Sequence, residues 1–177
     1  MTAYFRRQLV DYVEYHRDPR NCLAHVFGIV FLFLGPVLPL TMWTLPGFGG
    51  QIFGVHVTVA MLLAAPVLIY WLLLDPVLGL AILCSAIVLL SVAAAIVANV
   101  SVPAVWALSL VLIAIGVTAQ VVGHAIFERR KASMADHPAH FLLGPPFVMA
   151  KLFIAFGFRR DLAAIIGPVP ASYPGNR

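Results

Sequence analysis

Five of the six histidines in the sequence flank the first and the last of its long apolar stretches. His16 and His25 lie around the start of the first stretch, His124 lies near the end of the last one, and His137 and His140 follow it. Imidazole is a good ligand for iron, zinc, copper and nickel, and histidines with one carboxylate and open positions are typical of non-haem Fe(II) oxygenases. The pattern therefore indicates a metal site formed by residues that are distant in the sequence.

Two pairs of polar residues near these histidines have a spacing that places both side chains on one face of a helix. The pairs are His124 with Glu128 and Asn21 with His25. Such groups are costly at membrane depth unless they face a bundle interior or a wet cavity, so they are candidates for function. The alternative is that His124 and Glu128 only form a hydrogen bond between helices.

The individual histidines also have simpler interpretations. His16 and His25 could serve only as anchors at the membrane interface. His137 falls in a predicted loop, which makes it a weaker ligand candidate, and His140 is predicted to be a solvated neighbour. His56 lies at the end of the second apolar stretch that is remote from the other histidines, and we interpret it as structural or interfacial.

The composition determines what surrounds these residues. Of 177 residues, 62% are hydrophobic and 10% are charged, whereas a soluble domain is about half apolar and about a quarter charged. A water-soluble chain of this size would have to expose much of that apolar surface, so we predict an integral membrane protein. The 11 Lys and Arg residues flank the apolar stretches, which argues against a nucleic-acid partner.

We predict an all-α fold with about four transmembrane helices in a single membrane domain, residues 1–177. Four stretches are long and apolar enough to cross a bilayer, and turn-like segments separate them: residues 23–43, 52–74, 77–97 and 102–127. Residues 4–16 have apolar side chains at helical spacing, which predicts an amphipathic helix on the membrane surface. Residues 141–158 are predicted to be a shorter interfacial or re-entrant helix.

The positions of the basic residues predict the orientation in the membrane. The loops at residues 44–51 and 98–101 contain no Lys or Arg, and every basic residue lies before the first predicted span or after the fourth. An even number of spans puts both groups on one face, which the positive-inside rule makes cytoplasmic. We therefore predict a multi-pass protein of a bacterial inner membrane or the endoplasmic reticulum with both termini in the cytoplasm.

Two segments resemble the signatures of a known family. They are residues 15–29, YHRDPRNCLAHVFGI, and residues 120–131, QVVGHAIFERRK. Both are similar to elements of the membrane 2-hydroxy fatty acid dioxygenase family, enzymes of fatty acid alpha-oxidation long known only as a domain of unknown function. Many members have a proline before the alanine at position 132, where this chain has Lys131. That departure leaves the geometry of the following loop, and the role of His137, open.

The resemblance implies an Fe(II)-dependent enzyme that uses O2 to shorten a 2-hydroxy fatty acid by one carbon and release CO2. The histidines that match the family, or some of its members, are the expected ligands: His16, His25, His124 and His137. Glu128 matches the acidic position and is expected to be a further ligand or an acceptor that orients a histidine. Asn21 and Arg20 complete the expected catalytic residues, and Arg20 or Arg129 would neutralise the substrate carboxylate.

Two other functions are compatible with the same residues. The first is a membrane electron-transfer bundle in which two of the histidines ligate haem iron. The second is a scaffold or lipid-binding protein without catalytic activity, in which the polar residues only join helices. In each case membrane lipid surrounds the protein.

Overall fold

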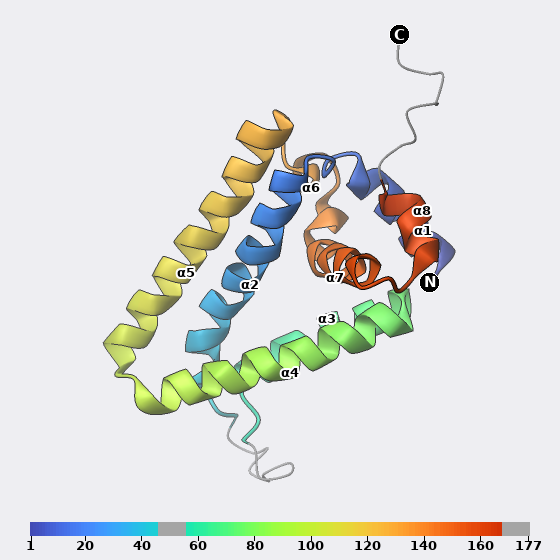
Figure 1. Cartoon of the computed structure of the whole chain (residues 1–177). Helices are drawn as coiled ribbons and strands as arrows, with labels where there is room; N and C mark the ends of the chain where they lie inside the picture. Colours follow the sequence, from blue (N-terminus) through green and yellow to red (C-terminus); the bar gives the residue numbers. More distant parts are fainter. Residues whose placement is uncertain (46–55, 168–177) are drawn as a thin grey trace, which may run out of the picture.

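The computed structural model describes residues 1–45 and 56–167. Both described parts are predominantly helical (Figure 1). The elements follow in this order: α1 (Ala3–Val13), α2 (Pro19–Thr41), α3 (Val59–Leu74), α4 (Pro76–Asn99), α5 (Val102–Val122), the π-helix η1 (Gly123–Glu128), α6 (Ser133–Asp136), the 3-10 helix η2 (Pro138–Leu142), α7 (Gly144–Ala155) and α8 (Arg160–Ile166). The predicted all-α fold is confirmed for this part of the chain.

Three helices in the described ranges are long and apolar enough to span a membrane: Pro19–Thr41, Pro76–Asn99 and Val102–Glu128. They coincide with the predicted first, third and fourth spans. The predicted second span differs, because α3 covers only 16 residues from Val59 to Leu74. Residues 52–55 of that prediction lie outside the described ranges, and residues 56–58 precede the helix. Three spanning helices are therefore supported, and a fourth remains a prediction.

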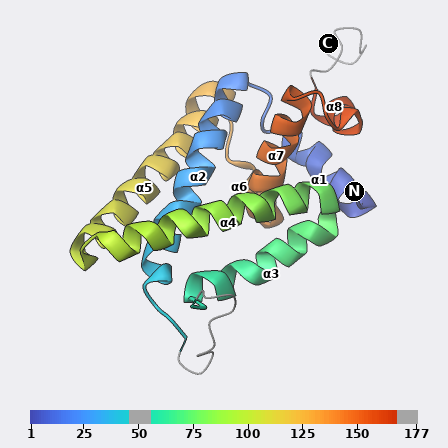
Figure 2. The same cartoon turned by 60° about the horizontal axis from the view of Figure 1, so that its bottom comes forward.

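α2 and α5 pack side by side along their length, as both views of the structure show (Figures 1 and 2). Their backbones approach closely at Gly116, where an added Cβ would lie 2.9 Å from the backbone oxygen of Gly28. Nearby, the Ser109 hydroxyl donates a hydrogen bond of 2.7 Å to the backbone oxygen of Gly35. Small residues permit this kind of close contact between membrane helices. The pair forms a rigid support for side chains at its end.

α1 buries the face that the sequence pattern predicts to be apolar. Thr2 caps the helix, since its Oγ1 accepts a hydrogen bond from the N–H of Phe5 at 3.1 Å. Phe5, Leu9, Tyr12 and Val13 are buried in the main hydrophobic cluster, together with residues of α3, α4, α7 and α8. The helix thus packs against protein. A location at the membrane surface remains a prediction for it and for α7, which lies within the predicted interfacial segment.

The start of α4 joins both ends of the described chain. Asp75 is buried and caps α4 by accepting hydrogen bonds from the N–H groups of Val77 and Leu78. Its carboxylate also binds the Arg159 guanidinium at 3.0 and 2.9 Å and the N-terminal ammonium group at 3.4 Å. Although burial opposes ionisation, these partners hold the pKa of Asp75 below its usual value. The contacts fix α1 and α8 beside the same end of α4.

Candidate metal centre

The turn between α1 and α2 brings His16 back against α2. Asp18 is the N-cap of α2, and its Oδ1 accepts a hydrogen bond from the N–H of Arg20 at 2.8 Å. Pro19 takes the first helical position, where a missing N–H costs nothing. The chain therefore reverses direction within a few residues, and the His16 ring meets His25 in the second turn of α2 with ring centroids 4.5 Å apart.

Hydrogen bonds determine the tautomers of His16 and His25. His16 Nδ1 lies 2.9 Å from the backbone oxygen of Tyr12, and His25 Nδ1 lies 3.0 Å from that of Asn21. A carbonyl oxygen can only accept, so each Nδ1 carries the proton and donates. Each Nε2 then presents a lone pair, and the two Nε2 atoms are only 3.2 Å apart. Two facing lone pairs repel each other unless a cation or a shared proton lies between them.

His124 joins this pair from the end of the α5 and η1 helix. It lies in η1, where α5 changes from α-helical to π-helical hydrogen bonding, and π-helical turns are frequent at functional sites. Its ring centroid is 4.9 Å from that of His16 and 4.8 Å from that of His25. His124 Nδ1 is buried and lacks a hydrogen-bond partner among the described residues. We call these three residues the histidine group.

The three side chains of the histidine group are close enough together to serve as ligands of one metal ion. Each member offers one ring nitrogen, and the three atoms lie within 4.8 Å of one another. Nitrogens bonded to one ion at about 2.1 Å lie about 3.0 to 3.4 Å apart in octahedral and tetrahedral complexes, which matches the distance between the Nε2 atoms of His16 and His25. Burial, with His25 and His124 nearby, lowers the pKa of His16 to about 2. His16 is therefore neutral, the form that binds metal.

Glu128 and Asn21 hold the helices that carry the histidine group. Glu128 Oε1 accepts hydrogen bonds from the N–H of Asp18 at 2.7 Å and from Asn21 Nδ2 at 3.1 Å. This carboxylate therefore joins the start of α2 to the end of η1. Asn21 is fully buried, and an added Cβ at Gly123 would collide with its Oδ1. Both residues lie beside the histidine group in a position to orient it.

Two predicted site residues are not brought into the histidine group. Arg20 is exposed, and its guanidinium binds the Asp18 carboxylate and lies 4.8 Å from the centre of the Phe127 ring. His137 is also exposed, and its nearest aromatic neighbour is His140, with ring centroids 4.8 Å apart. The structure therefore gives no geometric support for substrate binding by Arg20 or metal binding by His137.

His140 corrects a prediction from the sequence. It was expected to be a solvated neighbour, but its side chain is only 2% exposed. Both of its ring nitrogens are buried without a hydrogen-bond partner in the part of the chain that the structure describes. Within the apolar run that follows it, Leu143, Phe147 and Ala150 are buried in the main hydrophobic cluster, whereas Phe141 is exposed. That apolar run was the available signal for burial of His140.

A cavity of about 270 Å³ adjoins the histidine group. Its polar lining includes His25, His124, His140 and Gln120, and Ile29 is among its apolar lining residues. The Gln120 amide nitrogen is another buried donor without a partner among the described residues. A buried polar group costs free energy unless something binds it. The cavity can therefore accept a polar group next to an apolar one.

One comparison with known proteins gives a match that covers most of the chain. A family model described as 2-hydroxy-palmitic acid dioxygenase Mpo1-like matches residues 2–156. No curated protein and no solved structure matches the chain. The matched range contains the whole histidine group, Glu128 and Asn21, and it confirms the resemblance seen in the two sequence segments. The chain therefore belongs to the 2-hydroxy-palmitic acid dioxygenase Mpo1-like family.

Proposed function

We propose that this protein is an Fe(II)-dependent dioxygenase of the membrane that shortens 2-hydroxy fatty acids by one carbon. The observation that carries the proposal is the pair of Nε2 lone pairs of His16 and His25, which face each other at 3.2 Å beside the unpartnered His124. His16, His25 and His124 would hold the ion. Histidine ligands with open positions suit non-haem iron, and the family name supports a 2-hydroxy acid as substrate.

The overall reaction balances without a separate reductant. One 2-hydroxy acid and one O2 give the acid that is one carbon shorter, one CO2 and one water, as the bond between C1 and C2 breaks and C2 becomes the new carboxyl carbon. A bound Fe(II) ion would supply the one-electron chemistry that O2 requires. The protein's own part is to bind the substrate head beside the histidine group and to keep bulk water away.

The buried polar groups around the cavity suit the head of such a substrate. His140 and Gln120 have unpartnered polar atoms there, among the described residues. We assign them hydrogen bonds to the substrate's carboxylate and 2-hydroxyl group. Glu128 and Asn21 act as positioning residues, since they bind each other and the start of α2. The proposal gives no role to Arg20 or His137.

The geometry of His16 and His25 argues against haem ligation by that pair. Two axial haem ligands lie on opposite sides of the iron, about 4 Å apart if each bond is about 2.1 Å. The Nε2 atoms of His16 and His25 are 3.2 Å apart and leave no room for a porphyrin between them. The absorbance of the purified protein separates the two cases, because haem produces an intense Soret band and a mononuclear non-haem site does not.

The test of the proposed function is turnover of 2-hydroxypalmitate by purified protein supplied with Fe(II). We expect O2 uptake together with a product one carbon shorter, and loss of both in a His124→Ala variant because a ligand is removed. His56→Ala is the matched control, since His56 is exposed and lies outside the histidine group. A wild-type protein that consumes no O2 and forms no shortened acid would contradict the proposal.

We also propose that both termini are cytoplasmic. α1 and α8 contact each other, and Asp75 binds both the N-terminal ammonium group and Arg159 at the start of α8. The described ends of the chain are thus close together, which supports one side of the membrane for both. The basic residues concentrated there support the cytoplasmic side.

A further inference from the structure

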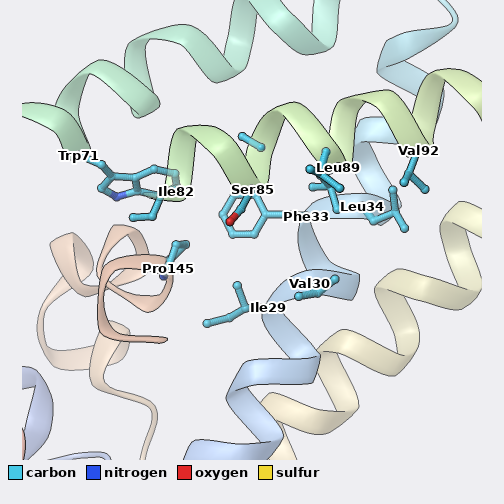
Figure 3. A pocket seen from close by; sticks show the side chains of 12 residues that line it. Ile29, Val30, Phe33, Leu34, Trp71, Ile82, Ser85, Leu89, Val92 and Pro145 are labelled. Atoms are coloured by element: carbon cyan, nitrogen blue, oxygen red, sulfur yellow. The ribbon is translucent and has the colours of Figure 1, made fainter. Parts of the chain in front are cut away.

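A second cavity adjoins the one at the histidine group. It has a volume of about 520 Å³ and lies between α2, α4 and the start of α7 (Figure 3). Ile29, Phe33 and Pro145 line both cavities. Ile29 and Phe33 follow His25 along one face of α2, one and two helical turns further on. The two cavities therefore form a path that starts at the metal ligands and continues along α2.

The lining of the second cavity is apolar almost throughout. Its two polar groups bind the protein itself: the Ser85 hydroxyl donates to the backbone oxygen of Ala81 at 2.9 Å, and Trp71 Nε1 donates to that of Leu142 at 2.7 Å. Figure 3 shows the lining side chains on two sides of an open space, with Trp71 and Pro145 at one end and Val92 at the other. The path is thus polar at the histidine group and apolar beyond it.

We propose that the second cavity binds the acyl chain of the substrate, and that residues of α4 beside Ser85 limit the length of chain that is accepted. This inference rests on the proposed function, which places the carboxyl end of the same molecule beside His25 and His124. The distance along α2 from His25 to Phe33 is about 12 Å. A long acyl chain whose head lies in the first cavity therefore reaches the second one.

The bilayer offers a direct route into this cavity. Val30 and Val88 line it and are 47% and 63% exposed on helices that are long and apolar enough to span the membrane. The edge of the cavity therefore opens to the lipid-facing surface between α2 and α4. A fatty acid dissolved in the membrane can insert its acyl chain sideways into the cavity without passing through water. Exposure of each methylene group to water would cost free energy.

Ser85→Phe tests the proposal, because a phenyl group at this small side chain would fill the middle of the cavity. We expect kcat/KM for 2-hydroxypalmitate to fall about tenfold relative to that for 2-hydroxyoctanoate, as about two methylene groups lose their binding site. Cys84→Phe is the matched control, since Cys84 is exposed on the same turn and lines neither cavity. An unchanged ratio in Ser85→Phe, or an equal change in Cys84→Phe, would overturn the proposal.

A second measurement does not need turnover. A 2-hydroxypalmitate analogue with a photoreactive group on its last carbon is added to the protein without O2, and the sample is irradiated. Peptide mass spectrometry then maps the positions of the adducts on the protein. We expect adducts on α4 between Ser85 and Val92 and their loss in Ser85→Phe. Adducts confined to other surfaces would indicate an unrelated lipid contact and overturn the inference. If the wild-type protein shortens no 2-hydroxy acid, the proposed function fails, and the adduct positions still decide where the acyl chain binds.

Discussion

At the scale of residues, the central feature is that ordinary backbone hydrogen bonds occupy one nitrogen of each of two imidazoles and leave the other nitrogen available to a ligand. Tyr12 and Asn21 offer carbonyl oxygens to the Nδ1 atoms of His16 and His25, which directs both Nε2 atoms to one point. Tyr12 also stacks on His16, with ring centroids 4.0 Å apart and planes 14° from parallel. These contacts hold the rings in place before any ligand binds, which reduces the entropic cost of binding.

His140 provides a prediction about substrate binding. Replacement by phenylalanine keeps an aromatic ring but removes both nitrogens, so the substrate head loses its hydrogen bonds. A hydrogen bond to a charged group contributes about 1.5 to 3 kcal/mol, so we expect kcat/KM for 2-hydroxypalmitate to fall roughly 10- to 100-fold. The iron content should stay that of the wild type.

Steady-state kinetics and elemental analysis of the same preparations check this expectation. His56→Phe serves as the control because His56 is exposed and far along the chain from the cavity lining. Two results would count against the assignment of His140: kinetics equal to those of the wild type, or loss of iron together with activity, which would make it a ligand or a structural residue.

At the scale of elements, hydrophobic length was enough to predict three of the long helices but not the start of α3 or the local distortion at η1. The predicted spans 23–43, 77–97 and 102–127 correspond to α2, α4 and α5 with η1. The spacing of His124 and Glu128 suggested one face of an α-helix, but they lie in a π-helical turn, where hydrogen bonds join residues five apart. The wider turn sends Glu128 to Asp18 and Asn21, a partnership that depends on tertiary packing.

The role of Glu128 at the junction of α2 and η1 leads to the next prediction. Glu128→Ala removes the acceptor of the Asp18 N–H and the shorter of two hydrogen bonds donated by Asn21 Nδ2, whose other acceptor is the backbone oxygen of Tyr15 at 3.4 Å. Loss of a group bonded directly to a metal ligand typically weakens metal binding roughly 10- to 100-fold; Glu128 acts on His25 only through Asn21, so we expect a decrease at the lower end, about tenfold. The Glu128→Gln variant should bind Fe(II) more tightly than the Glu128→Ala variant, because the glutamine amide oxygen can still accept a hydrogen bond from the N–H of Asp18.

Anaerobic calorimetric titration with Fe(II) measures these affinities. Asp11→Ala is a suitable control, since Asp11 is an exposed acidic residue on α1. Equal affinity for the wild type and Glu128→Ala would show that the junction does not orient the histidine group. A loss in Glu128→Gln as large as that in Glu128→Ala would instead indicate that the charge itself is needed, as in a metal ligand.

At the scale of the whole molecule, the fold brings distant parts of the sequence to one end of the α2 and α5 pair. The sequence predicted that His16, His25 and His124 would converge, because topology alone puts the start of the first span and the end of the last one on the same face. The sequence analysis did not anticipate the exposure of His137 or the burial of His140, since loop geometry depends on packing. The burial of His140 and the exposure of His137 follow from how η2 and α7 fold back against α1.

The most direct test of the account is the iron content of purified, Fe(II)-reconstituted variants whose helical content equals that of the wild type. We predict about one iron per chain in the wild type and in His137→Ala, and almost none when His16, His25 or His124 is replaced by alanine. The account is contradicted if these three replacements retain a full equivalent of iron, or if His137→Ala loses it.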